Sequence, residues 1–220
     1  GNYRGGVNSS RGDVGAYNPR NLGTGNTLVL LNGRRLVNMA TYQTELSGGS
    51  FVPVNSVNSQ TLPVFGLERV EVLRDGAAAQ YGSDAIGGVI NFILKDNDSG
   101  GTIMGQSGQF FEGEESWKVA GNVGFRLTDH GFFNCSFEAG DNEQLIRGFQ
   151  PAGARAAIDL GFPDVGNDSP YPGDTLAQTW GRPENDGVRT MWNSAIEMDN
   201  GAELYFFGNY AETYHNYRFF

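Results

Sequence analysis

The stretch LERVEVLRDGAAAQYGSDAIGGVINFILK, residues 67–95, decides the fold of the first half of the chain. Charged residues alternate with Leu and Val over residues 67–74, which predicts a strand. Asp-Gly breaks this strand, and the alanine-rich residues 77–81 favour a short helix. A glycine pair then leads into a second predicted strand at residues 89–95. Two strands around a short helix predict a small α/β unit.

The residues before this stretch add a strand and several connections to the unit. Residues 27–31, TLVLL, form a continuous apolar run, which predicts a strand buried on both faces. Asn-Gly at 32–33 predicts a turn, after which residues 34–37 return along the strand. Residues 38–61 are rich in Ser, Thr and Asn and predict a loop, and residues 63–66 predict a short turn or helical piece.

The second half of the chain has the pattern of antiparallel hairpins. Over residues 117–127, apolar side chains alternate with polar or small ones, so the predicted strand has an apolar face and a polar face. The turn residues 128–131 join it to a second alternating strand at 133–139. The other predicted strands are residues 102–110, which are weaker, and residues 188–198 and 204–210, with an Asn-Gly turn at 199–201.

The connections between these strands differ in length on the two sides of the sheet. Both tight turns fall on one side, while the link 111–116 and the segment 142–187 fall on the other. Short turns on one side and long loops on the other are typical of bacterial outer-membrane barrels. A soluble β-sandwich explains the alternation equally well, but the strand length and the aromatic residues near strand ends favour a barrel. Those aromatic residues are Trp117, Phe125, Trp192, Tyr205, Tyr210 and Tyr214.

Charge divides the chain near Lys95-Asp96. Residues 1–95 hold eight basic and six acidic side chains, whereas residues 96–220 hold seven basic and 19 acidic ones. The net charge of −10 argues against a nucleic-acid partner, which needs a basic face.

A single cysteine, Cys135, excludes an internal disulfide, and its place in an alternating apolar row predicts a packed side chain. No apolar run predicts a membrane helix, and the first residues do not form a signal peptide.

Two blocks of sequence resemble the plug domain of TonB-dependent receptors. Residues 67–95 resemble the end of that domain, and residues 26–36, NTLVLLNGRRL, resemble an earlier plug strand with its turn. The resemblance implies a mixed fold, in which a small α/β plug domain precedes antiparallel strands of a transmembrane β-barrel. About five strands of a large barrel are expected, because five alone cannot close around a wide interior. We predict a partial plug at 1–98, then the N-terminal part of the barrel at 99–220, with a long extracellular loop at about 142–187.

The resemblance also implies a function. It predicts an active-transport receptor in the bacterial outer membrane that takes up a scarce solute, such as a siderophore, a cobalamin or an oligosaccharide. The implied partners are the TonB protein of the inner-membrane complex, which supplies energy, the small solute ligand and outer-membrane lipid. No cofactor is expected, and we expect the N-terminal box that TonB binds to lie outside this sequence. The alternative is a structural or adhesive outer-membrane barrel without transport.

Candidate site residues fall into two sets. Aromatic side chains of the predicted loops suit stacking on a sugar or an aromatic siderophore. These candidate ligand-binding residues are Tyr42, Phe51, Phe149, Tyr171 and Trp180. In the family, charged plug residues contact the barrel wall, and Arg69, Glu71 and Arg74 are the candidates here; alternatively they are only solvated strand charges.

Neither an enzyme nor a metal site is predicted. His130 and His215 lie far apart without other ligands at metal-binding spacing. Three aspartates of the long loop, Asp164, Asp168 and Asp174, predict a solvated acidic loop rather than a Ca²⁺ site. No nucleophile motif, Ser/His/Asp arrangement or carboxylate pair stands out in the sequence.

Overall fold

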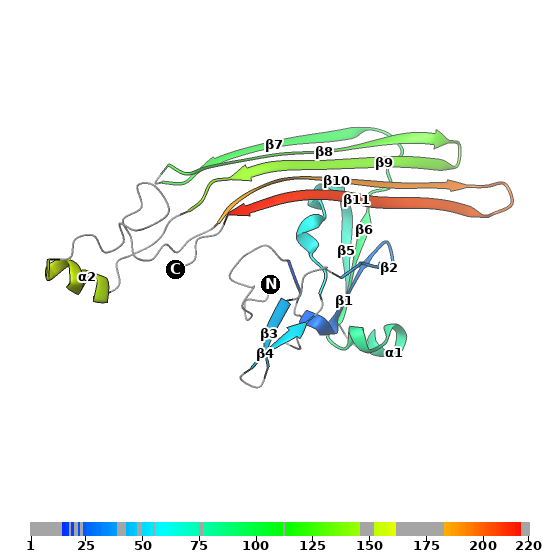
Figure 1. Cartoon of the computed structure of the whole chain (residues 1–220). Coiled ribbons are helices and arrows are strands. Elements are labelled where there is room, and N and C mark those ends of the chain that lie inside the picture. Colours follow the sequence, from blue (N-terminus) through cyan, green and yellow to red (C-terminus); the bar gives the residue numbers. More distant parts are fainter. Residues whose placement is uncertain are drawn as a thin grey trace.

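The chain folds into a small mixed sheet that lies beneath a long, curved antiparallel sheet (Figure 1). A computed structural model describes residues 15–17, 19, 22, 24–38, 43–47, 50–54, 56–74, 77–111, 113–145, 152–161 and 183–216. The helices of these described residues are all short, and none is long and apolar enough to cross a membrane. We call the small sheet with its helical turns the plug, and the long sheet the wall.

The plug sheet has the strand order β2-β1-β6-β5. Its strands are β1 (Thr27–Leu31), β2 (Arg34–Arg35), β5 (Leu67–Leu73) and β6 (Gly88–Leu94). β1 pairs with β6 in parallel, and four of its five residues are buried, which confirms the strand predicted from the apolar run. The predicted helix is α1 (Ala77–Tyr81), and the predicted piece at 63–66 is the 3-10 helix η5 (Val64–Gly66). Other 3-10 turns are η3 (Thr24–Asn26), η4 (Ser59–Thr61) and η6 (Ser83–Ala85).

The prediction of a loop over residues 38–61 is wrong in part. Strands β3 (Gln43–Ser47) and β4 (Ser50–Val54) form a separate hairpin within it, paired from Gln43↔Val54 to Ser47↔Ser50. The polar composition suggested a loop, yet Phe51 and the two valines after it are strand formers. Pro53 is compatible with a two-stranded hairpin, where both strands are edges.

The wall is a meander of five antiparallel strands in the order β11-β10-β9-β8-β7. They are β7 (Gly101–Gln109), β8 (Glu115–Thr128), β9 (Gly131–Asn142), β10 (Glu184–Glu197) and β11 (Glu203–Asn216). All five strands were predicted, and four of them, β8 to β11, are longer than predicted. Both tight turns lie at one end of the sheet (Figure 1). The long segment at the other end includes α2 (Ala152–Asp159), a helix that the sequence pattern did not predict.

The wall buries its polar face and exposes its apolar face. Asn134 and Ser136 on β9 are each only 2% exposed, whereas their neighbour Phe137 is 40% exposed. β8 repeats this pattern, because Asn122 is buried while Phe125 is about half exposed. A soluble β-sandwich would bury the apolar faces between its sheets. The structure therefore contradicts the sandwich alternative and agrees with a wall whose apolar face meets lipid.

The predicted aromatic girdles are only partly right. Trp192 lies in the middle of β10, where its ring covers the backbone of Gly208 on β11. Phe137 covers Gly121 of β8 in the same way. Tyr205 lies on the inner face of β11, where its ring contacts the plug. The Arg34 guanidinium carbon lies 5.4 Å from the ring centroid. Aromatic residues near strand ends therefore do not all mark a membrane interface, since some fill space beside a glycine or against the plug.

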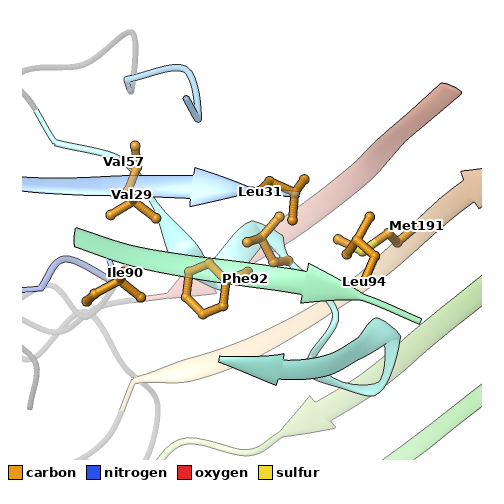
Figure 2. Packing of buried hydrophobic residues seen from close by; sticks show 8 residues of the cluster. Val29, Leu31, Val57, Ile90, Phe92, Leu94 and Met191 are labelled. Carbon is orange, nitrogen blue, oxygen red and sulfur yellow. The ribbon is translucent and has the colours of Figure 1, made fainter. Parts of the chain in front are cut away.

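The main apolar core lies between the plug strands and the wall. Val29, Ile90, Phe92 and Leu94 are central members, and Met191 of β10 joins them from the wall. Figure 2 shows the Met191 side chain close to Leu94, and the other labelled side chains come from β1, from β6 and, for Val57, from the segment before η4. The wall thus contributes the buried Met191 and the partly buried Phe207 of β11 to a core whose other members come from the plug. A second, smaller cluster is formed by Leu28, Leu30, Ala85 and Val89.

Candidate functional site

A network of asparagines forms the centre of the contact between plug and wall. On the wall, Asn122 Nδ2 donates to Asn134 Oδ1 at 2.6 Å and to Ser136 Oγ at 2.8 Å. Asn134 Nδ2 in turn donates to Asn97 Oδ1 at 2.7 Å, in the segment that leaves the plug. Asn122 and Asn134 are buried, whereas Asn97 is exposed, and the network satisfies the two amides whose burial would otherwise be costly.

A second asparagine pair joins the first turn of the plug to β10. Asn32 Nδ2 donates to Asn193 Oδ1 at 3.2 Å, and Asn193 Nδ2 donates to the Lys95 carbonyl at 3.1 Å. Asn32 also accepts from the Leu94 amide at 3.0 Å, so its side chain spans β6 and the wall. Its φ of 48° is a left-handed conformation that asparagine tolerates. The Asn-Gly turn thus both ends β1 and docks the plug.

Two glycines allow the plug and the wall to approach closely. A Cβ on Gly66 of η5 would lie 3.1 Å from Met191 Sδ and 3.2 Å from Ser136. A Cβ on Gly124 of β8 would overlap the backbone of Asn97. Larger residues would therefore push the plug from the wall at both places.

The turn around η4 provides a separate contact with the wall. Arg189 Nε of β10 donates to the Gln60 carbonyl at 2.5 Å, and Asn209 Nδ2 of β11 donates to the Thr61 carbonyl at 3.3 Å. Asn58 caps this turn, because its Oδ1 accepts from the Gln60 amide at 3.0 Å. A charged donor to a carbonyl is one of the stronger hydrogen bonds in proteins, so Arg189 is the main wall contact of the turn.

Arg189 also belongs to a charged cluster in a pocket of the wall. Glu138 lies directly opposite it on β9, with 4.0 Å between Glu138 Oε1 and Arg189 Nη1. Lys118 Nζ of β8 lies 3.0 Å from Glu138 Oε2, as an ion pair that lacks hydrogen-bond alignment. The Glu138 side chain is 9% exposed, so its charge requires these two cations.

The pocket has a volume of about 230 Å³ and lies near the end of the sheet that carries the long links. Its polar lining besides the charged cluster is Gln106, Ser116, Asn142 and Asn185. Ser116, Asn142 and Asn185 lie within one residue of the ends of their strands at that side. Amide, hydroxyl, ammonium and guanidinium groups around one carboxylate can bind an oxygen-rich polar solute by several hydrogen bonds.

An ion pair fixes the segment that connects plug and wall at the other side of the asparagine network. Arg126 of β8 contacts Asp98 Oδ2 through Nη2 at 2.6 Å and through Nε at 2.7 Å. The hydrogen bonds from the Arg126 guanidinium hold the pKa of the Asp98 carboxyl below its ordinary value of 3.8. The connection after β6 is therefore attached to the wall at Lys95, Asn97 and Asp98.

The predicted plug–wall residues lie on β5 or directly after it, and their contact with a barrel wall stays a prediction. Arg69 pairs with Glu71 on the same strand at 2.9 Å, and both side chains are about half exposed. Glu71 also accepts from Asn91 of β6 at 3.1 Å. Arg74 is exposed and follows the strand. The wall contacts described above use polar residues that the sequence prediction missed. The polar positions of the wall strands were visible in the sequence, but their plug partners were not.

The predicted ligand-binding residues are not brought together in the part of the chain that the structure describes. Tyr42, Phe149, Tyr171 and Trp180 lie outside the described residues. Phe51 lies in β4, where its backbone pairs with Leu46. The five residues therefore stay a prediction. Within the described ranges, no three or more His, Cys, Asp or Glu side chains are grouped to hold a metal ion.

Comparison with known proteins matches the first part of the chain to a domain family. Residues 2–89 match the model of the TonB-dependent Receptor Plug Domain. The chain is 31% identical over 120 residues to "Probable TonB-dependent siderophore receptor PirA" of Acinetobacter baumannii, and this covers 54% of the chain and 15% of that protein. It is 31% identical over 137 residues to "Vitamin B12 transporter BtuB" of Photobacterium profundum, which covers 51% of the chain and 20% of that protein.

A solved structure resembles the chain more loosely. The crystal structure of the siderophore receptor PirA from Pseudomonas aeruginosa aligns with 90% of the chain and 35% of that protein, at a TM-score of 0.41 and 19% identity. The chain therefore spans about a third or less of the length of these known proteins. The relatives are named as receptors and transporters rather than as enzymes.

Proposed function

We propose that this chain, which belongs to the TonB-dependent receptors of the outer membrane, takes part in the uptake of a scarce solute, with energy supplied through TonB. The proposal rests on which face of the wall is buried. Its polar face covers a folded plug, and its apolar face is exposed. A protein that only anchors to the membrane has no need of a plug docked on the inner wall, whereas a gated pore does.

The solute enters at the end of the sheet that carries the long links, and there it meets the wall pocket. Lys118 and Arg189 offer positive charge to an anionic group, and the amide and hydroxyl groups of the pocket bind further oxygen atoms. A ferric siderophore is the solute class that these groups suit best, and cobalamin is the other class named among the relatives. The aromatic residues Tyr171 and Trp180 are proposed to stack on the solute from the predicted extracellular loop.

No covalent step on the solute is proposed. The plug occludes the pore, and uptake requires part of the plug to move after TonB engages the complete protein. The residues of the chain bind the solute and hold the plug in place. Binding is therefore separable from uptake, because the first needs only the outer pocket and the second needs the plug to move.

The test is uptake by a strain that lacks the gene for the complete protein. Radioiron-loaded siderophores of the catecholate and hydroxamate classes and radiolabelled cobalamin are supplied to the deletion strain, to the complemented strain and to a complemented strain without TonB. We expect accumulation of one of these solutes only in the complemented strain with TonB. If the deletion strain accumulates every probe at the normal rate, the transport proposal fails in favour of a structural or adhesive barrel.

Variants of the wall pocket sharpen this test. The Lys118→Gln variant is expected to lower solute affinity by roughly ten- to a hundredfold, since a charged hydrogen bond contributes roughly 1.5–3 kcal/mol. Arg126→Gln is the matched control, because it removes a basic wall residue that does not line the pocket. Equal affinity in the two variants would place the solute elsewhere, and replacement of Tyr171 and Trp180 would then test the predicted loop.

A further inference from the structure

The segment Gly15–Tyr17 is docked on the η4 turn by three hydrogen bonds. The Gly15 amide donates to Asn58 Oδ1 at 2.9 Å, and the Gly15 carbonyl accepts from the Ser59 amide at 3.0 Å and from Ser59 Oγ at 2.8 Å. Gly15 and Ala16 are buried, and the Tyr17 ring packs against Phe92 with 6.0 Å between centroids. Residues 15–17 are thus held by the turn as well as by the core.

The fit between this segment and the turn is close. A Cβ on Gly15 would lie 2.6 Å from Ser59 Oγ and 3.0 Å from Gln60 Cγ, so only glycine fits there without a shift. Asn58 Oδ1 accepts two backbone N–H groups at once, those of Gly15 and Gln60. The same side-chain oxygen therefore caps the turn and binds the segment.

The other side of the same turn is bound to the wall. The two carbonyls that follow Ser59 accept from Arg189 and Asn209, as described above. η4 has only three residues, so the groups that bind the segment and those that bind the wall are adjacent in the chain. A 3-10 turn rises by about 2 Å per residue, which leaves no flexible length between the two contacts. A shift of the wall-bound side therefore moves the groups that bind Gly15.

Arg189 lines the wall pocket and also binds the η4 turn. Its guanidinium faces both the Gln60 carbonyl and the Glu138 carboxylate. A change in the pocket that draws the guanidinium toward Glu138 or toward a bound oxyanion weakens its bond to Gln60. The route from the pocket to residue 15 then consists of Arg189, the η4 turn and Asn58.

We infer that Arg189 is a positioning residue that couples the wall pocket to the docking of residues 15–17, through the turn capped by Asn58. The coupling does not depend on which solute the pocket takes or on whether transport occurs. It links a wall pocket to a segment that precedes the first strand of the plug, two sites that are far apart in the sequence.

The experiment measures amide hydrogen exchange of residues 15–17 in the complete protein, folded in lipid nanodiscs without solute. Arg189→Gln is expected to make this segment exchange about tenfold faster, because the turn loses its strongest bond to the wall. Arg126→Gln is the matched control, since it removes an arginine–plug contact at Asp98 and is expected to leave the segment unchanged. Asn209→Ala removes the weaker bond to Thr61 and is expected to give a smaller increase.

A double variant separates coupling from general loosening. In the Asn58→Ala background the turn has lost its cap and its bond to the Gly15 amide, and of the three bonds described only the two from Ser59 to the Gly15 carbonyl remain. Adding Arg189→Gln is therefore expected to change exchange of residues 15–17 by less than the single Arg189→Gln variant does. Two independent structural effects would instead multiply. The inference is overturned if Arg189→Gln leaves residues 15–17 as protected as in the unmodified protein, or if the double variant shows the full product of the single effects.

Discussion

Strands β6 and β9 lie in the same molecule and bury opposite kinds of side chain. β6 buries Val89, Ile90, Phe92 and Leu94, as a strand in the centre of a water-soluble sheet does. β9 buries Asn134, Ser136 and Glu138 and leaves Phe137 exposed. β6 is mostly apolar and β9 alternates between apolar and polar residues, and each pattern predicts a strand. Neither pattern alone shows which face of the strand is buried. The surroundings decide it, since the outer face of the wall meets lipid and the inner face meets the plug.

Met191 is the exception that joins the two regions. It lies on the inner face of β10 and is 2% exposed, between polar positions of the same face. Its side chain completes the plug core beside Leu94 (Figure 2). The inner wall is therefore polar where it meets plug backbone and side-chain amides, and apolar where it meets the plug core.

The largest expected effect comes from the plug core. Phe92→Ala removes a buried aromatic side chain and leaves a cavity, which is expected to destabilise the plug by about 3–5 kcal/mol. The free energy of opening is measured from hydrogen exchange of the β6 amides in the complete protein. Phe206→Ala on the outer wall is the comparison, and equal losses at the two sites would show that the faces do not differ.

A smaller loss is expected within the polar network of the wall. Asn134→Ala leaves Asn122 and Asn97 each without one partner, at an expected cost of about 1–3 kcal/mol. The readout is hydrogen exchange of residues 95–98. Cys135→Ala, at the adjacent outward position, is the control and is expected to leave exchange there unchanged. A larger effect from Cys135→Ala than from Asn134→Ala would contradict the assignment of faces.

The outer face is expected to tolerate substitution better than either buried region. Phe206 stacks with Trp192 at 6.3 Å between centroids and is 62% exposed. Phe206→Ala loses an aromatic pair worth roughly 0.5–1.5 kcal/mol, while lipid covers the remaining surface. The barrel's melting temperature, followed by the mobility of folded protein on semi-native electrophoresis, is expected to fall only slightly. Phe206→Leu is the milder control, and a loss comparable to that of Phe92→Ala would contradict lipid exposure.

The smallest expected effect is a pH dependence at Asp98. Because its folded pKa is lowered, Asp98 contributes stability above its unfolded pKa, and this contribution is lost as pH falls through the folded value. Asp98→Asn is therefore expected to increase exchange of residues 95–98 slightly at neutral pH and to match the unmodified protein in acid, well below 3.8. A difference that grows as the pH falls would have the wrong sign.

Much of the fold could be predicted because local pattern and tertiary environment agree. The apolar run of β1, the alternation of β5 and β8, and the Asn-Gly turn before β11 each contain their own signal. The hairpin of β3 and β4 was missed because β3 and the residues around the hairpin are polar, and α2 because it is a short helix in a segment without periodicity. Strand existence was therefore easier to predict than the structure of the long connections.

The candidate site could be predicted much less well. Asn32 bonds to Asn193, 161 positions later, and no local pattern pairs two such residues. Arg69 and Glu71 were selected from the family resemblance; they pair with each other on β5, and their contact with a barrel wall stays a prediction. Gln60 and Thr61 dock through backbone carbonyls, which are present at every residue and carry no sequence signal.

The most direct test of the account is a nitroxide scan along β11 in the complete protein, reconstituted in lipid after Cys135→Ser. Each label is measured for collision with oxygen, which concentrates in lipid, and with a water-soluble nickel complex. We expect high oxygen accessibility at Leu204, Phe206 and Tyr210, and low accessibility to both reagents at Phe207 and Asn209. High oxygen accessibility at Phe207 and Asn209 instead, or no alternation of accessibility along the strand, would contradict a wall that turns its apolar face to lipid and its polar face to the plug.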